Sequence, residues 1–394
     1  MSLPPLRLRK NEERRLRAGH LWVFSNEVDV AATPLTAFAP GDAVEVVDHR
    51  GGPLGTGYVN PRSLIAARLV TRGRGRALDG ALLRERIAHA LALRERLFPR
   101  PFYRLVFGES DGLPGLVVDR FGDVVVAQIG TAGMERVKAE VVAALDEALR
   151  PAGILLRNDV PGRALEGLDA YVETAAGEMP DQLTVEENGA RFEVPVSGQK
   201  TGWFYDHRMN RARMQAYVPG RRVLDVFSYV GGWGVQAAAA GAESVLCVDG
   251  SAAALDALHH NAALNGVADR VRTMKADAFD ALRALAADGE RFDVVVLDPP
   301  AFIKRKKDQK AGEEAYRRIA QLGMEVLRPD GVLISASCSF HMSREALQDA
   351  MLRASRHVKR DLQITEEGHQ GPDHPVHPAI PETAYLKAFF GRVS

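Results

Sequence analysis

Two short segments near the C-terminus combine residue types that can do covalent chemistry. Asp298 follows the apolar run Phe292–Leu297, and Cys338 comes shortly after a second apolar run at residues 331–335. Runs of this kind are typical of buried strands in a parallel sheet. If the two strands are neighbours, a carboxylate and a thiol lie side by side at the carboxyl edge of the sheet, where open α/β folds bind their ligands.

A thiol beside an acid fits the methylation of a pyrimidine carbon. C5 of cytosine or uracil becomes nucleophilic only after a group has added to C6, and a thiolate is an effective nucleophile for that addition. We therefore expect Cys338 to add to C6 of a target cytosine while Asp298 bonds or protonates N3. C5 then takes a methyl group from a sulfonium donor, a base such as His341 removes H5, and the thiolate leaves. The plain alternative for Cys338 is a buried structural thiol.

The residues around Asp298 leave a second reaction open. In Asp298-Pro299-Pro300 both prolines fix φ and lack an N–H, so the turn is stiff and the carbonyls before it can accept bonds. In methyltransferases that act on amino groups, an aromatic residue directly follows the second proline of a similar turn. Here Ala301 holds that place and Phe302 comes one residue later. N-methylation, with Cys338 as a bystander, is therefore weakened but stays an alternative.

The elements that must position these groups alternate regularly from residue 221 onward. Strand patterns and helix patterns follow one another, which predicts the α/β fold class, with a doubly wound, Rossmann-like parallel sheet. The predicted strands are 223–227, 245–249, 271–275, 292–297, 332–335 and a last one at 384–390. The predicted helices are 234–240, 252–264, 278–287, 314–327 and 344–353.

The first predicted strands end in groups suited to a nucleoside-containing cofactor. Asp225 precedes a turn with Gly231 and Gly232, where backbone amides can approach a ligand without a Cβ in the way. Asp249, 24 residues further on (249 − 225), can accept both ribose hydroxyls, and Asp277 can reach an adenine amino group. The ribose carboxylate suits NAD equally well, and an NAD dehydrogenase is a distant alternative. Asp225 suits a cationic methionine group, and the glycine spacing departs from G-x-G-x-x-G, so S-adenosylmethionine is favoured.

The remainder of the chain predicts two smaller domains. Residues 1–75 show short strand patterns separated by turn signals, which indicates a small β-rich domain. Residues 76–178 open with a helix pattern at 82–98 and predict an α+β domain. A hairpin around the turn dipeptide Asn188-Gly189 then belongs to the third domain, residues 179–394.

The composition excludes several other classes of protein. Lys and Arg total 51 and so do Asp and Glu, so any nucleic-acid surface must be a local patch. Cys247 and Cys338 are the only cysteines, which excludes a disulfide framework. His369, His374 and His377 lie in a Pro-rich loop without clustered acids, and we expect no metal there. No run reaches the roughly 18 apolar residues of a membrane helix, so we expect a soluble, cytoplasmic protein without a membrane partner.

Two clusters of positive charge are candidates for RNA contact. One directly follows the Asp-Pro-Pro turn, where residues 304–310 contain five cations and one acid. Charges beside an active site can hold phosphates, although such runs are often only solvated loops. The second cluster is N-terminal. The predicted RNA-binding residues are Arg14, Arg17, Lys304, Arg305, Lys306 and Lys307.

These motifs resemble, in order and over nearly the whole chain, the RlmI-like family of ribosomal RNA large-subunit cytosine-C5 methyltransferases. Residues 20–24 and 55–61 resemble its N-terminal PUA domain, a small RNA-binding barrel, and the middle segment resembles its β–β–α–β–β domain. Residues 200–208 are similar to a segment that lines its cofactor pocket. The resemblance implies S-adenosylmethionine, ribosomal RNA as partner and a homodimer. Small departures, such as Ala301 where a lysine is common, remove no reacting group.

Motifs and resemblance together predict one set of site residues. The catalytic residues are Cys338 and Asp298. The cofactor-binding residues are Lys200, Thr201, Phe204, Asp206, Arg208, Asp225, Phe227, Ser228, Tyr229, Gly231, Gly232, Asp249, Ser251, Asn261, Asp277, Ala278, Asp298, Pro299 and Pro300. A non-catalytic RNA-binding or ribosome-assembly factor that retains the cofactor fold is the alternative from a different functional class.

Overall fold

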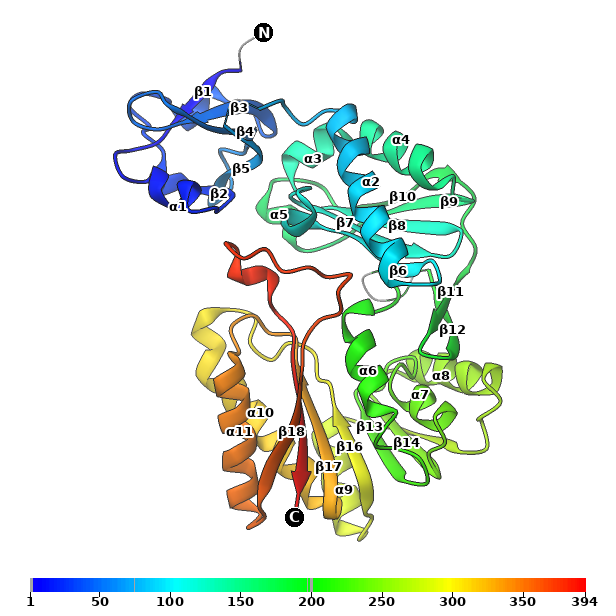
Figure 1. Cartoon of the computed structure of the whole chain (residues 1–394). Helices are drawn as coiled ribbons and strands as arrows, with labels where there is room; N and C mark the ends of the chain where they lie inside the picture. The colour runs from blue at the N-terminus through cyan, green and yellow to red at the C-terminus, as the bar shows by residue number, and fades with distance from the viewer. Residues whose placement is uncertain (1–2, 74, 197, 199–200) are drawn as a thin grey trace. The chain divides into compact units, whose positions relative to one another are not determined.

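The computed structural model describes residues 3–73, 75–196, 198 and 201–394, so the predicted cofactor residue Lys200 lies outside the described residues. The chain divides into two compact units (Figure 1). The first unit consists of Met1–Leu183, Pro195–Trp203 and Pro372–Thr383. The second consists of Thr184–Val194, Phe204–Gly371 and Ala384–Ser394.

The first unit begins with a five-stranded sheet in the order β1-β3-β4-β5-β2. Its strands and helix are β1 (Pro5–Arg7), α1 (Glu13–Arg17), β2 (Trp22–Phe24), β3 (Asp42–Val47), β4 (Pro53–Val59) and β5 (Ile65–Arg72). Alternate apolar residues such as Val44 and Val46 of β3 are fully buried in its core, together with Leu6 and Val23. The β-rich pattern predicted for the N-terminal segment is confirmed.

A second sheet of this unit has the order β10-β9-β8-β7-β6, and α2 packs with α4 against it (Figure 1). The α+β pattern predicted for the middle segment is thereby confirmed. Its elements are α2 (Gly80–Leu97), β6 (Phe102–Phe107), β7 (Leu116–Phe121), β8 (Val124–Ile129), α3 (Ala132–Arg136), α4 (Lys138–Leu149), β9 (Gly153–Asn158), α5 (Gly162–Leu165) and β10 (Tyr171–Gly177).

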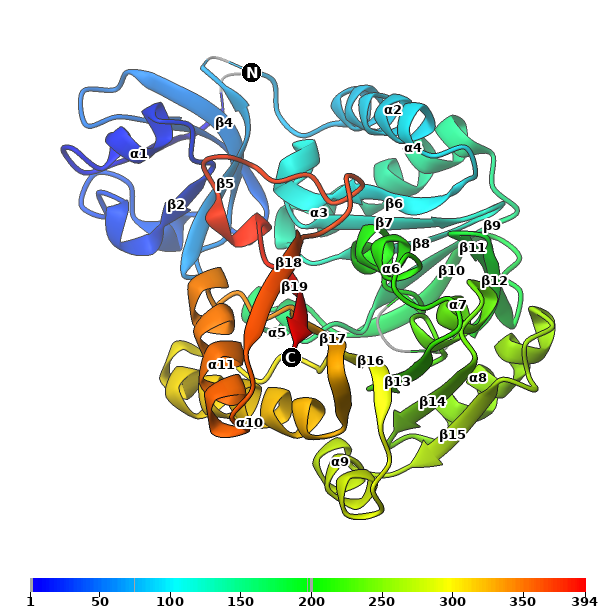
Figure 2. The same cartoon turned by 60° about the horizontal axis from the view of Figure 1, so that its bottom comes forward.

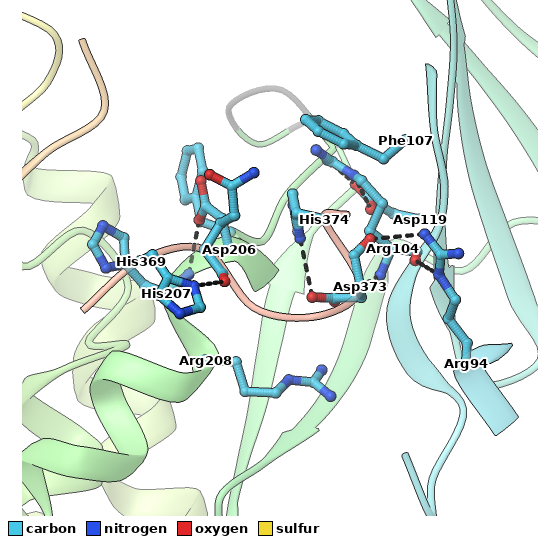
Figure 3. A network of polar contacts seen from close by, with 12 residues as sticks. Arg94, Arg104, Phe107, Asp119, Asp206, His207, Arg208, His369, Asp373 and His374 are labelled. Carbon is cyan, nitrogen blue, oxygen red and sulfur yellow. Dashed lines mark hydrogen bonds and ion pairs between the residues drawn. The ribbon is translucent and has the colours of Figure 1, made fainter. Parts of the chain in front are cut away.

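Arg94 of α2 is fully buried and ties the segment Pro372–Thr383 to this unit. Its guanidinium donates to both carboxylate oxygens of Asp111 (2.6 and 2.7 Å) and to the carbonyl oxygen of Asp373 (2.9 Å). The Arg104 N–H donates to Asp373 Oδ2 at 3.1 Å, and Figure 3 shows these side chains together. The segment is thus held by buried, charge-assisted bonds rather than by apolar packing alone.

The second unit is built on a seven-stranded sheet in the order β15-β14-β13-β16-β17-β19-β18. The first five strands in this order are parallel, and β19 is antiparallel to both of its neighbours. The strands are β13 (Arg222–Val226), β14 (Ser244–Asp249), β15 (Val271–Lys275), β16 (Phe292–Leu297), β17 (Leu327–Ser337), β18 (Leu362–Gly368) and β19 (Lys387–Val393). The hairpin of β11 (Gln182–Glu187) and β12 (Ala190–Pro195) turns at Asn188 and Gly189 as predicted, both with positive φ.

Helices cover both faces of this sheet, as the strand periodicity requires. Leu246 and Val248 of β14 belong to the core shared with α9, α10 and α11, whereas Cys247, between them, faces α7. Figures 1 and 2 show α10 and α11 beside the strands β17 and β18. The helices are α6 (Arg208–Met214), α7 (Gly234–Ala239), α8 (Ala252–Leu264), α9 (Ala278–Ala287), α10 (Gln309–Glu325) and α11 (Arg344–His357).

The predicted parallel sheet is confirmed, with three differences at its C-terminal end. Helix α10 begins at Gln309, inside the basic run, and not at residue 314. The last strand is shifted, because the register pairs Lys387 with Ser337 and Val393 with Gly331. Strand β18 was not predicted, since its alternate residues are only half-buried apart from the buried Gly368, and the residues between them are exposed and polar. Among the described residues, no helix is long and apolar enough to cross a membrane.

Substitution of Arg94 tests how the segment Pro372–Thr383 is held. In Arg94→Met the carboxylate of Asp111 stays buried without its cation. We expect this to lower the free energy of unfolding by about 3–5 kcal/mol. Thermal unfolding measures the loss, and limited proteolysis reports earlier cleavage near His374. Arg96→Met, an exposed arginine of the same helix, is the matched control. Equal melting temperatures for the two variants contradict the assignment.

Candidate active site

The end of the pair β16 and β17 brings the two predicted catalytic residues to one edge. The strands are parallel neighbours, with Leu297 opposite Ser335, and Figure 2 shows them side by side. Asp298 follows the end of β16, and Cys338 follows Ser337, the last residue of β17. The neighbourhood on which the sequence argument depended is therefore present. Cys338 is half-buried, so its sulfur is neither packed away like Cys247 nor fully exposed.

Hydrogen bonds between buried hydroxyls lock the turn that carries Cys338. Ser337 Oγ donates to Tyr316 Oη of α10 at 2.9 Å, and Tyr316 Oη and Ser339 Oγ are 3.1 Å apart. Ser339 Oγ also accepts from the N–H of Ile303 at 3.3 Å. Since Ile303 belongs to the segment that follows Asp298-Pro-Pro, the two loops with the predicted reacting groups are fixed to each other.

Asp298 is an ionised carboxylate held by an ion-pair contact with one ring and a hydrogen bond from another. Its Oδ1 lies 3.1 Å from His207 Nε2, and its Oδ2 accepts from Trp233 Nε1 at 3.0 Å. Burial opposes the charge, but the contact with His207 and the bond from Trp233 outweigh it and hold the pKa of Asp298 below its usual value. Burial likewise opposes the charge on His207, and Asp298 outweighs it, so the pKa of His207 is raised.

The loop after β13 has an unusual backbone. Phe227 and Tyr229 have φ of 68° and 48°, in the left-handed region that costs side-chain-bearing residues energy, and Gly231 follows with φ 92°. The N–H groups of Phe227 and Ser228 both donate to the carbonyl of Val248 (2.9 and 3.0 Å), and the Tyr229 N–H donates to Asp249 Oδ2 (2.9 Å). Strand β14 thus holds the loop in a strained shape, which is common where a backbone wraps a ligand.

Two buried polar atoms, one in β13 and one in the loop after it, have no hydrogen-bond partner among the described residues. Asp225 is fully buried; its Oδ2 accepts from the Gly234 N–H at 2.8 Å, whereas Oδ1 has no partner. Ser228 Oγ is also buried without one. Burial, chiefly, raises the pKa of Asp225 to about 7, and Asp298 and Asp249 add to the effect. Unpaired buried groups are costly, so these atoms mark a place prepared for a polar ligand.

The acids after β14 and β15 hold backbone groups and keep acceptor capacity. Asp249 accepts from Tyr229 through one oxygen and from the Ser251 N–H through the other, at 2.8 Å. Asp277 caps α9 through Oδ1. Each carboxylate oxygen has two lone pairs, so both acids can still accept from a bound ligand. Asn261 differs, because it is fully buried. It donates to Val230 O and accepts from Glu193 N, so it holds the loop after β13 against β12.

The other predicted cofactor residues of these loops flank the same strand ends. Phe227 is half-buried, and its ring lies 6.3 Å from that of Phe302 in the loop after β16. Gly232 is half-buried before α7, and Ala278 is the buried first residue of α9. In the Asp-Pro-Pro turn, Pro299 is buried and Pro300 is exposed.

The segment around residue 206 is divided between the units. Thr201 belongs to the first unit and Phe204, Asp206 and Arg208 to the second. Asp206 accepts from the Tyr385 hydroxyl (2.6 Å) and the His207 N–H (3.0 Å), and the neighbouring His207 and His369 appear in Figure 3. The Arg208 guanidinium lies 5.0 Å from the ring centre of Tyr205. Phe204 stacks edge-on with Tyr229 at 5.9 Å, which brings this segment to the β13 loop.

The predicted RNA-binding cations are exposed, but not equally available. Lys304, Arg305, Lys306 and Lys307 are exposed in the loop before α10, and Arg305 pairs with Asp308 at 3.0 Å. Arg17 pairs with Asp48 at 2.7 Å, and Arg14 donates to Asn11 at 3.1 Å. Among the described residues, no group of three or more His, Cys, Asp or Glu side chains is arranged to hold a metal ion.

Four residues near the reacting groups were not predicted. His207 and Trp233 lie within quoted motifs, so their proximity to Asp298 follows from the segments already noticed, but their pairing needed the fold. Tyr316 and Lys387 carry no local signal. Lys387, only 5% exposed, donates to the carbonyls of Ser339 (2.7 Å) and Tyr385 (2.8 Å).

Comparisons with known families agree with this architecture. A family model described as a PUA-like domain matches residues 6–72, and one described as an S-adenosylmethionine-dependent methyltransferase matches residues 164–391. The residues present fit this donor: Asp225 and Ser228 offer buried oxygens that no other described residue bonds, and a Cβ on Gly234 would lie 2.4 Å from Cys247 Sγ and 3.0 Å from Asp225 Oδ2. S-adenosylmethionine is therefore the cofactor, as predicted.

Individual relatives cover nearly the whole chain. Proteins named ribosomal RNA large subunit methyltransferase I include one from Klebsiella pneumoniae (strain 342), 38% identical over 99% of this chain and 98% of the relative. One from Shewanella denitrificans is 39% identical over 98% of this chain and 99% of the relative. A SAM-dependent methyltransferase structure from Streptococcus mutans covers 99% of this chain and 100% of that one, with TM-score 0.83 and 20% identity. At that identity the likeness shows the fold, and it confirms the predicted fold class.

Donor affinity is expected to fall below pH 7. Asp225 must be ionised to hold a cationic amino group, and its pKa of about 7 means that it is protonated in more acidic solution. We expect the Kd of S-adenosylhomocysteine to rise about tenfold per pH unit below 7. Calorimetry from pH 5.5 to 8.5 measures this. Asp225→Asn should bind weakly with a flat profile, and an equally steep profile in that variant contradicts the assignment.

The His207–Asp298 pair predicts a pH-dependent contribution to stability. Because the pKa of His207 is raised from 6.5, its contribution is fully present below pH 6.5 and is lost as the pH rises through the folded-state pKa. Asp298 contributes above its ordinary pKa of 3.8. Between these limits we expect His207→Gln to lower the free energy of unfolding by about 1–3 kcal/mol, with a smaller loss at pH 9. Denaturant titrations at several pH values, with the exposed His259→Gln as control, decide it.

Proposed function

The chain belongs to the S-adenosylmethionine-dependent ribosomal RNA large subunit methyltransferase I family, and from this premise we propose that it methylates C5 of a cytosine in large-subunit ribosomal RNA through a covalent adduct with Cys338. One observation carries the proposal: a half-buried thiol and an ionised carboxylate follow the ends of adjacent parallel strands. An N-methyltransferase needs the carboxylate turn but has no use for the thiol.

The donor site supports the first half of the reaction. When bound, S-adenosylmethionine supplies the electrophilic methyl group. The unpaired oxygens of Asp225 and Ser228 are suited to its methionine end, and Asp249 to its ribose hydroxyls. Because the loop between Asp225 and Gly231 is held in its strained form by β14, these acceptors are positioned before the ligand arrives.

The ionised state of Asp298 defines the role that we propose for it toward the pyrimidine ring. The low pKa makes Asp298 a poor proton donor by itself, so it accepts a hydrogen bond from the pyrimidine edge. The proton of the pair resides on His207, whose Nε2 contacts Asp298. A proton for N3 can therefore come from His207 through Asp298, at the moment when thiolate addition makes N3 basic. His341, half-buried with its ring 5.4 Å from that of Phe340, stays the candidate for removing H5.

Substrate binding is proposed from charge and domain content. Lys304, Lys306 and Lys307 are exposed in the loop that follows the Asp-Pro-Pro turn, where they can contact phosphates next to the target base. The PUA-like domain at residues 6–72 offers a second RNA-contacting surface, to which we assign Arg14 and Arg17. The homodimer, the cytoplasmic location and the domain bounds 1–75, 76–178 and 179–394 stay predictions.

Cys338→Ala tests the covalent mechanism. We expect the variant to lose methyl transfer to large-subunit RNA by at least about 10³-fold, because C5 is inert without the C6 adduct. Cys247→Ala is the matched control: Cys247 is fully buried in β14, which β13 and β16 separate from β17, so this change removes a thiol that cannot reach the base and should cost far less turnover than Cys338→Ala. Wild-type protein should also form a covalent complex with RNA that carries 5-fluorocytosine, visible as a shifted, denaturation-resistant band.

The alternatives give different results. If the Asp-Pro-Pro turn methylates an amino group, Cys338→Ala keeps nearly full activity and no adduct forms. If the chain is a non-catalytic assembly factor, calorimetry detects no S-adenosylmethionine binding. Mass spectrometry of ribosomal RNA from cells with and without the gene identifies the modified nucleotide, and unchanged 5-methylcytosine contradicts the proposed product.

A further inference from the structure

A buried lysine faces the turn that carries the sulfur. Lys387 is the first residue of β19, and the antiparallel register places it opposite Ser337, the residue before Cys338. It is 5% exposed, and long cationic side chains are seldom buried to that extent without a reason. The position arises only because β19 inserts antiparallel beside β17 at the carboxyl edge of the sheet.

The ammonium of Lys387 is oriented by neutral groups. Its Nζ donates to the carbonyl of Ser339, the residue after Cys338, at 2.7 Å, and to the carbonyl of Tyr385 at 2.8 Å. An ammonium has three N–H donors, so these bonds leave one. Carbonyl dipoles alone compensate a buried cation poorly, and an anion close by would compensate it better.

Among the described residues, the charged groups that act on Lys387 are Arg344 and Cys338. Arg344, at the start of α11, disfavours the charge on Lys387 and is itself paired with Glu367. Tyr316 is bonded to the hydroxyls of Ser337 and Ser339, and burial raises its pKa, so it stays neutral. Cys338 is the group whose ionisation favours the charge on Lys387; burial is the larger effect and lowers the pKa of Lys387 to about 8.

We propose that Lys387 is a positioning residue that keeps Cys338 in the thiolate form and orients it toward the target base. The inference rests on the proposed function, in which Cys338 is the nucleophile. Two bonds from one ammonium, to the carbonyl of the residue after the cysteine and to that of Tyr385 just before β19, fix the cation at the turn that carries the sulfur. Sequence patterns contain no trace of this pair, because 49 residues (387 − 338) separate its members.

The pairing assists both covalent steps. In addition, a lone pair of the thiolate forms the S–C6 bond, and the π electrons of the C5–C6 bond move into the ring toward N3, which takes a proton. Methyl transfer then gives C5 a new carbon and releases the neutral thioether of the donor. In elimination, H5 leaves as a proton to the base, its bonding pair forms C5=C6, the S–C6 pair returns to sulfur, and N3 gives back the proton that it took in the addition. Lys387 stabilises the thiolate before the first step and after the last.

Alkylation of the free protein tests the pair without RNA or methyl transfer. The rate of iodoacetamide modification at Cys338 is followed against pH by mass spectrometry, with Cys338→Ser as background. For wild-type protein we expect a midpoint below the ordinary thiol value of about 8.5. Lys387→Met should raise the midpoint by about one pH unit or more. Lys387→Arg keeps the charge and should retain a lowered midpoint.

Two controls separate loss of charge from loss of structure. Arg392→Met removes an exposed cation at the other end of β19 and should leave the midpoint unchanged. Lys387→Gln keeps N–H donors for the carbonyls of Ser339 and Tyr385 but carries no charge, and it should behave like Lys387→Met. Each variant must still bind S-adenosylhomocysteine, which shows that the sheet edge is intact.

The outcomes are distinct from those for the proposed function. A wild-type midpoint at or above about 8.5, or equal midpoints in wild type and both uncharged variants, overturns the role of Lys387 even if Cys338 is the nucleophile. Conversely, if Cys338→Ala retains turnover, the covalent mechanism fails whatever the alkylation profile shows. The interaction between Lys387 and Cys338 is supported if the midpoint rises in Lys387→Met and Lys387→Gln but not in Lys387→Arg or Arg392→Met.

Discussion

The parallel pairing of β16 with β17 is the constraint on which the site depends. Parallel neighbours end at the same edge, so the residues after them must share a small volume whatever the loops do next. Buried hydrogen bonds then fix the two loops to each other: Ser337 Oγ donates to Tyr316 Oη, the Tyr316 and Ser339 hydroxyls bond each other, and the Ile303 N–H donates to Ser339 Oγ. Rigid elements thus determine where the reacting groups lie, and the loops supply only their chemical types.

Burial sets the chemistry of this edge. In a medium of low polarity the neighbours of a titrating group decide whether it is charged, and three groups at this edge show the effect. Asp298 is kept ionised by His207 and Trp233, and Lys387 is bonded to two carbonyls beside Cys338. Within the described part of the chain, one oxygen of Asp225 has no hydrogen-bond partner, and the pKa of this carboxyl is raised. Because titrating groups with perturbed pKa values cluster at functional sites, their gathering here supports this edge as the candidate active site.

Much of the fold could be predicted from period and turn chemistry. The bounds of β15, β16, α8 and α9 were predicted residue for residue, because strongly periodic apolar runs are interrupted there by clear caps such as Ser251 and Asp277. Strand β18 was missed because this antiparallel edge strand lacks a continuous apolar run. The last strand, β19, lies between β17 and β18 and begins three residues later than predicted (387 − 384). Asn261 shows what sequence patterns cannot tell about a site. Its side chain bonds the backbone of Val230 and Glu193, and nothing local in the sequence indicates those partners.

By itself the sequence determined which chemical groups follow each strand: Asp225, Asp249, Asp298 and Cys338 each come after an apolar run that must be buried. It also determined the α/β class, since period and order are properties of the chain. Only the tertiary structure decided which groups meet across long separations, such as His207 with Asp298 and Lys387 with the turn at Cys338. The physical reason is that strand order and register, not distance along the chain, bring such groups together, and burial then makes their interaction strong.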